Sequence, residues 1–482
     1  LMIKNFLLIL TLAWGVMGAN YYVDTITTGL NNGTSWQNAW QGLKSIAWTD
    51  ITGGDTIFIS GGADTTKYTD TLKIQKAGLI DNPFVITIGR SAGHNGYVVI
   101  PTVYAWYLRK HWVLDGFNGS DAVRRIIIDG NSDLDETVEE GEKTDGISLY
   151  ASDSITIKNV VVQNFNDNGI KIRYNIYFIN IINCRIKNTR YDGININVED
   201  TLSLPPANRC EIYVVDSCVI DSCMDDAITI CACGVTLKNS YLRCGDLPAF
   251  QGSHPDAVQI LEGKRWICID NNKIINAQQG VFCERTNGFV RITNNLFYDT
   301  PDESGYNAQI SINESDKNGG NIGHTLIANN VFYHAVWAAI RFPPSGFDPE
   351  DSLIIKNNIF YDCAHFFMDT CYRPYKISKS NIFWNTSTAF CQPSCSAYPD
   401  SGMHIDPLFV NPTAYDFTLQ PTSPAIGSGD DLSAYFTTDR AGLIRSVPWD
   451  IGPYEYGTPP QPTNPTITSV SPSSPRLFKT FE

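Results

Sequence analysis

Asp145-Gly146-Ile147 opens a phrase that returns along the chain as Asn168-Gly169-Ile170, Asp192-Gly193-Ile194, Asp226-Ala227-Ile228, Asp256-Ala257-Val258 and Gln279-Gly280-Val281. The steps between successive phrases are 23, 24, 34, 30 and 23 residues. A near-constant period of this size is typical of a solenoid, in which each repeat forms one turn. If every phrase takes the same place on its turn, the polar residues that open it stack into a column.

The segments between the phrases read as short β-strands. The runs 154–159, 177–183 and 266–271 alternate apolar and polar residues with a period of two, which favours strands over helices. Asn adopts the left-handed backbone of tight turns, and its amide can bond to a copy on the next turn. Asn follows eight of these strands, at Asn159, Asn183, Asn239, Asn271, Asn294, Asn329, Asn357 and Asn381. We therefore predict an all-β, right-handed parallel β-helix with a cap at each end.

The chain divides by composition into five segments. Residues 1–19 read as a secretory signal peptide, with Lys4 before a short apolar run, so we expect a secreted protein. We predict an N-terminal cap over 20–60, the β-helix over 61–405 and a C-terminal cap over 406–456. Residues 457–482 are rich in Pro, Ser and Thr and read as a linker to a further domain.

Charge and cysteine content narrow the function further. The formal net charge is −15 and no basic stripe stands out, so we expect no nucleic-acid partner. Beyond the signal peptide no run is long and apolar enough to suggest an integral membrane protein, and we expect a monomer. The 13 cysteines leave three readings open: disulfides of a secreted protein, a zinc site without any CxxC pair, or small buried apolar residues.

Both ends of the solenoid carry a family resemblance. Tyr21-Tyr22-Val23-Asp24 with Gly33-Thr34-Ser35-Trp36 at the start, and Asp406-Pro407-Leu408-Phe409 with 450–456 at the end, flank the repeated phrases. Together they resemble secreted bacterial right-handed parallel β-helix proteins of the pectin-lyase-like superfamily. The resemblance implies the fold and the two caps, and it implies no particular reaction.

The acidic residues of the phrase could form a reactive site. Asp192, Asp226 and Asp256 would lie on three successive turns, about 5 Å apart, with Asp225 beside them. Carboxylates this close cannot all stay ionised without help, so either one keeps a proton with a raised pKa or a cation binds among them.

The cation alternative predicts a Ca²⁺-assisted polysaccharide lyase. Asp192-Gly193-Ile194 followed by Asp225-Asp226 is similar to the calcium site of family 9 pectate lyases, which implies a Ca²⁺ ion held by Asp192, Asp225, Asp226 and Asp256. The family's lysine base falls at Gln259, so Lys264, Arg265 or Arg285 would have to remove the proton.

The proton alternative predicts a glycoside hydrolase. Arg190-Tyr191-Asp192, Asp225-Asp226, Ser253-His254-Pro255 and Glu284-Arg285-Thr286 follow the order of polygalacturonase phrases in degraded form. The resemblance implies that the aspartates act as acid and base, that His254 tunes the acid and that Arg285 holds a substrate carboxylate.

Two alternatives without catalysis compete with the lyase and the hydrolase predictions. Aspartate at a turn can simply accept backbone hydrogen bonds, and Asp145 and Asn168 occupy the phrase outside the candidate site. The chain could also be a non-catalytic glycan-binding or adhesive β-helix. We nevertheless expect cleavage of an acidic, uronic-acid polysaccharide, with a lyase preferred over a hydrolase. The predicted catalytic residues are Asp225, Asp226, His254, Asp256, Lys264 and Arg285, and the predicted substrate-binding residues are Gln259, Arg265 and Trp266.

Overall fold

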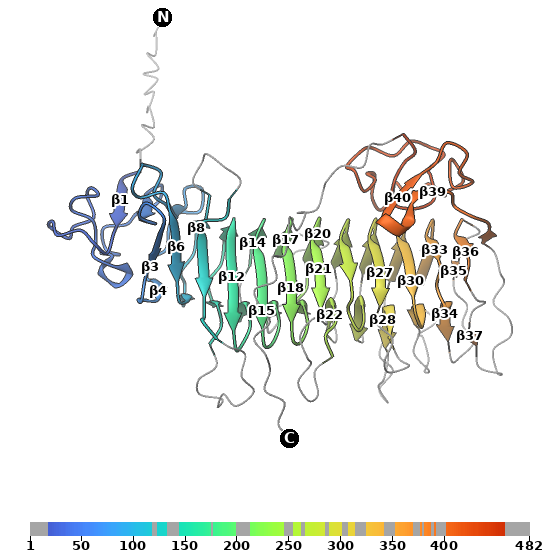
Figure 1. The fold of residues 1–482 in the computed structure, drawn as a ribbon, viewed down its shortest axis with the longest axis horizontal. Coiled ribbons are helices and arrows are strands. Elements are labelled where there is room, and N and C mark those ends of the chain that lie inside the picture. The colour runs from blue at the N-terminus through green and yellow to red at the C-terminus, as the bar shows by residue number, and fades with distance from the viewer. Residues whose placement is uncertain are drawn as a thin grey trace, which may run out of the picture.

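The computed structural model describes residues 18–117, 123–132, 144–174, 177–198, 213–244, 254–261, 266–284, 289–300, 307–313, 324–341, 352–369, 376–377, 380–386, 390–391 and 402–457. Within them the chain winds as a right-handed parallel β-helix, as predicted, with three long parallel sheets (Figure 1). Each turn adds one strand to sheet A, then to sheet B, then to sheet C.

Sheet A contains 13 described strands. They are β1 (Asn20–Val23), β2 (Thr56–Ile59), β5 (Phe84–Ile88), β8 (Trp112–Asp115), β11 (Ile155–Lys158), β14 (Ile179–Ile182), β17 (Tyr213–Asp216), β20 (Val235–Lys238), β23 (Ile267–Asp270), β26 (Val290–Thr293), β29 (His324–Ala328), β32 (Ser352–Lys356) and β35 (Lys376–Ile377).

Sheet B also contains 13 described strands. They are β3 (Thr65–Lys67), β6 (Tyr97–Ile100), β9 (Ile126–Asp129), β12 (Val160–Phe165), β15 (Arg185–Thr189), β18 (Val219–Cys223), β21 (Tyr241–Cys244), β24 (Lys273–Ile275), β27 (Leu296–Thr300), β30 (Val331–Ala335), β33 (Ile359–Tyr361), β36 (Ile382–Trp384) and β38 (Met403–His404).

Sheet C contains 12 described strands and carries the repeated phrase. They are β4 (Leu72–Ile74), β7 (Val103–Trp106), β10 (Ile147–Tyr150), β13 (Ile170–Arg173), β16 (Ile194–Asn197), β19 (Ile228–Cys231), β22 (Val258–Ile260), β25 (Val281–Glu284), β28 (Ala308–Asn313), β31 (Ala338–Arg341), β34 (His365–Asp369) and β37 (Phe390–Cys391).

The core follows from the period of two within each strand. Every second side chain points inward and stacks on the equivalent side chain of the next turn, as Ile170, Ile194 and Ile228 do in sheet C. This close packing requires a glycine in the phrase at Gly193. A Cβ at Gly193 would lie 2.5 Å from Ile220 Cγ2, which real side chains do not allow.

Asparagine forms two ladders along the corner between sheets A and B. Seven of the eight predicted residues, from Asn159 to Asn357, have positive φ, and Asn183 Nδ2 donates to Asn159 Oδ1 at 2.7 Å. Asn381 instead belongs to an inner ladder, whose members are fully buried. In that ladder Asn330 Nδ2 donates to Asn358 Oδ1 at 3.0 Å, and Asn358 Nδ2 donates to Asn381 Oδ1 at 3.2 Å.

The C-terminal segment folds over the outside of the solenoid (Figure 1). It contains the hairpin of β39 (Phe409–Asn411) and β40 (Asp416–Leu419) and the 3₁₀ turn η3 (Pro412–Ala414). Phe409 and Phe417 bury the outer faces of Val331 and Ile359 on sheet B. At the other end, the 3₁₀ turn η1 (Leu43–Ser45) lies between β1 and β2.

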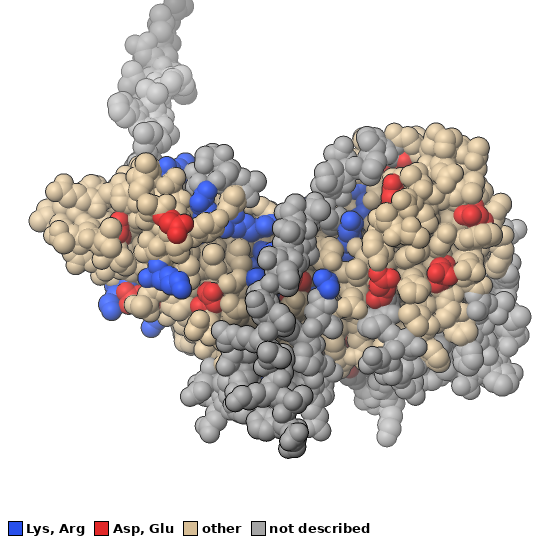
Figure 2. Space-filling view, in the orientation of Figure 1, with Lys and Arg blue, Asp and Glu red and all other residues tan. Residues whose placement is uncertain are grey.

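Charge is unevenly spread on the face seen in Figure 2, which looks onto sheet B. Lys and Arg gather beside the N-terminal half, and Asp and Glu dominate the C-terminal half. Among the described residues, no helix is long and apolar enough to cross a bilayer. The signal-peptide and linker predictions fall almost entirely outside the described residues.

The nine cysteines whose side chains the structure describes are free thiols, and all but Cys231 are buried. Cys184 and Cys218 lie in the main apolar core among isoleucines. Of the three readings of the cysteines, the small apolar residue is therefore the one that these nine positions favour.

Candidate active site

The strand register of sheet C stacks the phrase as predicted. Ile170, Ile194, Ile228, Val258 and Val281 are direct partners on neighbouring strands. The residues two places earlier, Asn168, Asp192, Asp226, Asp256 and Gln279, therefore form one column at the edge of the sheet.

Part of the column is architectural. Asp226 Oδ1 accepts the backbone N–H of Asp256 at 3.0 Å, and Asp256 Oδ1 accepts the backbone N–H of Gln279 at 3.0 Å. One oxygen of each aspartate thus ties its turn to the next, as the turn-capping alternative expects.

Side chains on sheet C hold two of the remaining oxygens. Asn195 Nδ2 donates to Asp192 Oδ2 at 2.5 Å, and Thr229 Oγ1 donates to Asp226 Oδ2 at 3.1 Å. Sequence analysis missed these two donors, although both stand three residues after their aspartate. These two hydrogen bonds direct the carboxylates of Asp192 and Asp226 toward the outer face of sheet C.

Asp256 differs from the equivalent residue outside the site. Asn168 Nδ2 donates to Asp145 Oδ1 at 3.0 Å, so that carboxylate is satisfied by an amide. Asp256 is fully buried, and its Oδ2 has no hydrogen-bond partner among the described residues. The contact at this oxygen is His254 Nδ1 at 3.3 Å, an ion-pair distance without hydrogen-bond alignment. An unsatisfied buried carboxylate costs free energy, and such groups concentrate at functional sites.

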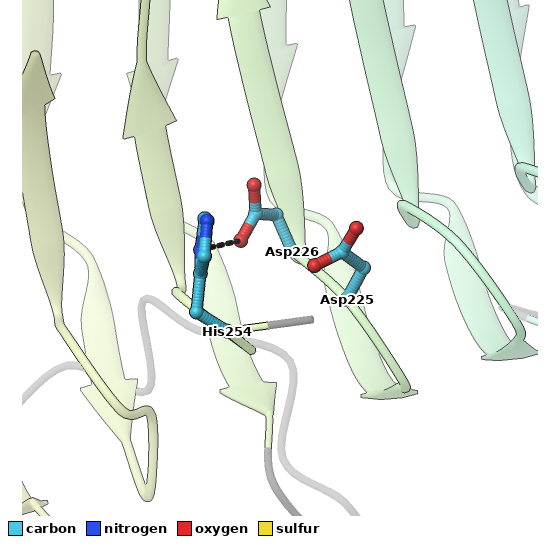
Figure 3. Close-up of side chains that lie close together, drawn as sticks. All are labelled: Asp225, Asp226 and His254. Carbon is cyan, nitrogen blue, oxygen red and sulfur yellow. Dashed lines mark ion pairs between the residues drawn. The ribbon is translucent and has the colours of Figure 1, made fainter. Parts of the chain in front are cut away.

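Asp225, Asp226 and His254 converge where the column meets solvent (Figure 3). One ligand atom from each lies within 4.8 Å of the others, and His254 Nδ1 is 4.0 Å from Asp226 Oδ1. The side chain of His254 is 44% exposed and Asp225 is half-buried, whereas Asp226 is buried. The cluster is therefore open to a ligand on the side of Asp225 and His254.

Burial and mutual repulsion shift the titration of these groups. Burial raises the pKa of Asp192 and of Asp256 to about 6. The pKa of Asp226 rises well above its usual range through burial and the charges of Asp256, Asp192 and Asp225. The close carboxylate of Asp256 raises the pKa of His254 to about 9. A carboxyl group with a raised pKa therefore lies beside an imidazole whose pKa is also raised.

Of the other predicted residues, the structure describes Gln259 and Trp266. Gln259 is on β22, where it pairs with Thr229 and Phe282 in register. Trp266 lies just before β23, at the opposite end of β22 from Asp256, with its ring tilted against Phe289 at 5.7 Å. Lys264, Arg265 and Arg285 lie outside the described residues. The binding and catalytic roles of these five residues stay predictions.

The cluster could hold a cation, but its donors fit Ca²⁺ poorly. Ca²⁺ prefers six to eight oxygen ligands, whereas one of the three convergent donors is an imidazole nitrogen. Asp192, Asp226 and Asp256 already accept hydrogen bonds. A protonated His254 would also repel a cation.

No protein-family model matches the sequence, and none of the curated proteins compared with it is similar to it. The fold is similar to that of pectate lyase Pel9A, with a TM-score of 0.49 and 14% identity over 91% of this chain and 97% of that one. It is also similar to XylC in complex with xylose, with a TM-score of 0.49 and 11% identity over 91% and 99% of the two chains. A third similar structure is the A-module of the Azotobacter vinelandii mannuronan C-5 epimerase AlgE4, with a TM-score of 0.45 and 12% identity over 80% and 100%. All three are parallel β-helix proteins.

Proposed function

We propose that this chain is an enzyme that cleaves an acidic, uronic-acid polysaccharide by acid–base chemistry at Asp225, Asp226 and His254. The observation that carries the proposal is a close pair of carboxyl groups: the pKa of buried Asp226 rises well above its usual range, and burial also raises the pKa of half-buried Asp225. Two carboxyl groups whose environments differ are what glycoside hydrolysis requires. The order of preference between the two predicted chemistries therefore changes in favour of the hydrolase.

Each residue has a distinct role in this scheme. Asp226 is the acid: its raised pKa favours the protonated form, which gives its proton to the oxygen of the leaving sugar. Asp225 is the second carboxylate. Its separation from Asp226 is nearer the ≈5 Å of enzymes in which this group attacks the sugar than the ≈6.5–9.5 Å that leaves room for water. The imidazolium of His254 offsets the negative charge of the ionised aspartates beside it and so reduces the repulsion among them.

Cationic side chains on the same sheet favour an acidic substrate. Lys171 is the direct partner of Asn195 on the neighbouring strand, and Arg173 is the direct partner of Asn197. Both lie on the turn before Asp192, on strand β13. Arg173 can bind a uronate carboxylate through its two-pronged guanidinium, whereas Lys171 Nζ already lies 3.9 Å from Asp167 Oδ1.

The calcium-assisted lyase remains the second candidate, because three ligand atoms approach within 4.8 Å. The test is to incubate the protein with a panel of uronic-acid polymers, with and without a chelator. Reducing ends and the absorbance of unsaturated product are both followed. We expect reducing ends without unsaturated product, in the presence of chelator.

Two matched variants connect the activity to the cluster. Asp226→Asn should abolish cleavage, whereas Asp145→Asn, the same change in the same phrase outside the site, should retain it. Unsaturated product that disappears with chelator would support the lyase instead. If no polymer is cleaved but one is bound, the chain is a non-catalytic glycan-binding protein.

A further inference from the structure

Aromatic side chains cover the N-terminal end of sheet C. Five of them form a connected surface, the aromatic platform, which comprises Tyr104, Trp106, Tyr107, Tyr150 and Tyr174. Ring centroids lie 5.6 Å apart for Tyr104 and Trp106, 5.0 Å for Tyr107 and Tyr150, and 4.7 Å for Tyr150 and Tyr174. Trp106 is 50% exposed and Tyr107 is 61% exposed. Contiguous exposed aromatic area of this kind marks a binding surface more often than a core.

A cavity of about 410 Å³ lies beside the platform. Lys73, Gln75 and Arg109 line it together with Tyr104 and Trp106. The cavity therefore combines ring faces, which suit the apolar faces of sugars, with two cations, which suit carboxylates.

The platform and the candidate active site lie on one continuous face. Direct strand partners run along sheet C in the order Tyr104, Ser148, Lys171, Asn195 and Thr229. A parallel row runs in the order Trp106, Tyr150, Arg173 and Asn197. The second row passes from aromatic through basic to polar residues. The first row has Ser148 between Tyr104 and Lys171, and it ends on the hydrogen-bond donors of Asp192 and Asp226.

The length of this track matches an oligomer, not a single sugar. Four strand steps separate β7, which carries Trp106, from β19, which follows Asp226. At the usual strand spacing this is about 19 Å. Only a ligand of several sugar residues could touch both ends.

We infer that the aromatic platform is a distal binding site for a linear polyanionic glycan that runs along sheet C to Asp225 and Asp226. The inference rests on the proposed function, because it takes the same polymer as ligand. Trp106 and Tyr150 stack on sugar rings, while Arg173 and Arg109 pair with carboxylates along the chain. The platform raises affinity for long substrates and keeps them bound between cleavages.

The test measures binding without turnover. Uronate octamers and dimers, and a neutral xylo-oligosaccharide of octamer length, are titrated calorimetrically into the Asp226→Asn variant. Trp106→Ala is added to this background, and Trp384→Ala, which removes a 37% exposed tryptophan from sheet B, is the matched control. Losing one stacking contact of about 1.4 kcal/mol should weaken octamer binding about tenfold. Dimer binding and the Trp384→Ala control should be unaffected.

The outcomes separate this inference from the proposed function. Equal affinities for the two tryptophan variants, or equal affinity for the neutral octamer, would overturn the distal site even if the native chain cleaves uronans. Binding that depends on Trp106 would support the distal site even if the native chain cleaves nothing. Dimerisation of the native chain that Trp106→Ala abolishes would instead assign the platform to contacts between copies.

Discussion

Asp256→Asn tests the electrostatics of the column through the pH dependence of stability. Asp256 is fully buried, and its pKa rises from 3.8 to about 6 on folding. A carboxyl group with a raised folded pKa stabilises the fold below its unfolded pKa and loses that contribution as pH rises through the folded pKa. The native chain should therefore lose stability between about pH 4 and pH 6.5, and the variant should lose less.

The size of the difference follows from the shift. The rise in the pKa of Asp256 on folding changes the free energy of unfolding by about 3 kcal/mol over the whole titration. About 2 kcal/mol of this change falls between pH 4 and pH 6.5. His254 adds little in this window, because it is protonated in both states below its unfolded pKa of 6.5. For a chain of this size we expect the difference between the two melting temperatures to change by about 2 °C over this pH range.

The assay is thermal unfolding followed by circular dichroism at pH 4 to 6.5, in chelator so that no cation holds the carboxylates ionised. Asp64→Asn, at an exposed position, is the control and should melt in parallel with the native chain. The reasoning fails if the gap between the native chain and Asp256→Asn is constant across this range.

Three further outcomes are expected. Asn330→Ala removes a fully buried amide that bonds to Ile292, Asn295 and Asn358, and should cost about 3–5 kcal/mol in chemical unfolding, while exposed Thr413→Ala should change stability by less than about 0.5 kcal/mol. His254 has a pKa of about 9, so activity should decline through pH 9 as the imidazolium deprotonates, and His254→Gln should flatten that limb of the pH–rate profile; a native profile that is flat to pH 10 would contradict the assignment. Asp225→Asn should lower the cleavage rate at least about 100-fold with an unchanged melting temperature, and a loss smaller than about tenfold would remove Asp225 from the mechanism.

The fold could be predicted from the sequence because the residues that repeat along it have strong preferences for particular backbone conformations. Asn159 and its equivalents adopt the left-handed conformation that other residues avoid, so the corner could be placed directly. Asn381 was placed on the wrong ladder. The pairs 271–272, 294–295, 329–330 and 357–358 carry the signal that would have separated the two ladders, since the second Asn of each pair points inward.

The candidate site was readable only in part. The stacking of Asp192, Asp226 and Asp256 follows from the period, and the structure confirms it. The division of their oxygens between backbone and side-chain donors depends on three-dimensional geometry that spacing does not encode. His254 stands in an insertion between β21 and β22, whose path the repeat does not fix, so its contact with Asp256 could be suggested by the resemblance alone.

The corner between sheets A and B has a consequence for how this molecule can diversify. From β11 to β33 this corner takes only one or two residues per turn, and side-chain hydrogen bonds of asparagine connect most of the corners to their neighbours, with Ser217 and Cys218 in place of asparagine after β17. A residue inserted at this corner would break hydrogen bonds on three turns at once, so we expect this corner to tolerate no insertions. The two other edges border sheet C and accept segments of many residues, as between β16 and β17 or β21 and β22. New loops can therefore be added around sheet C, one turn at a time, without disturbing the corner between sheets A and B.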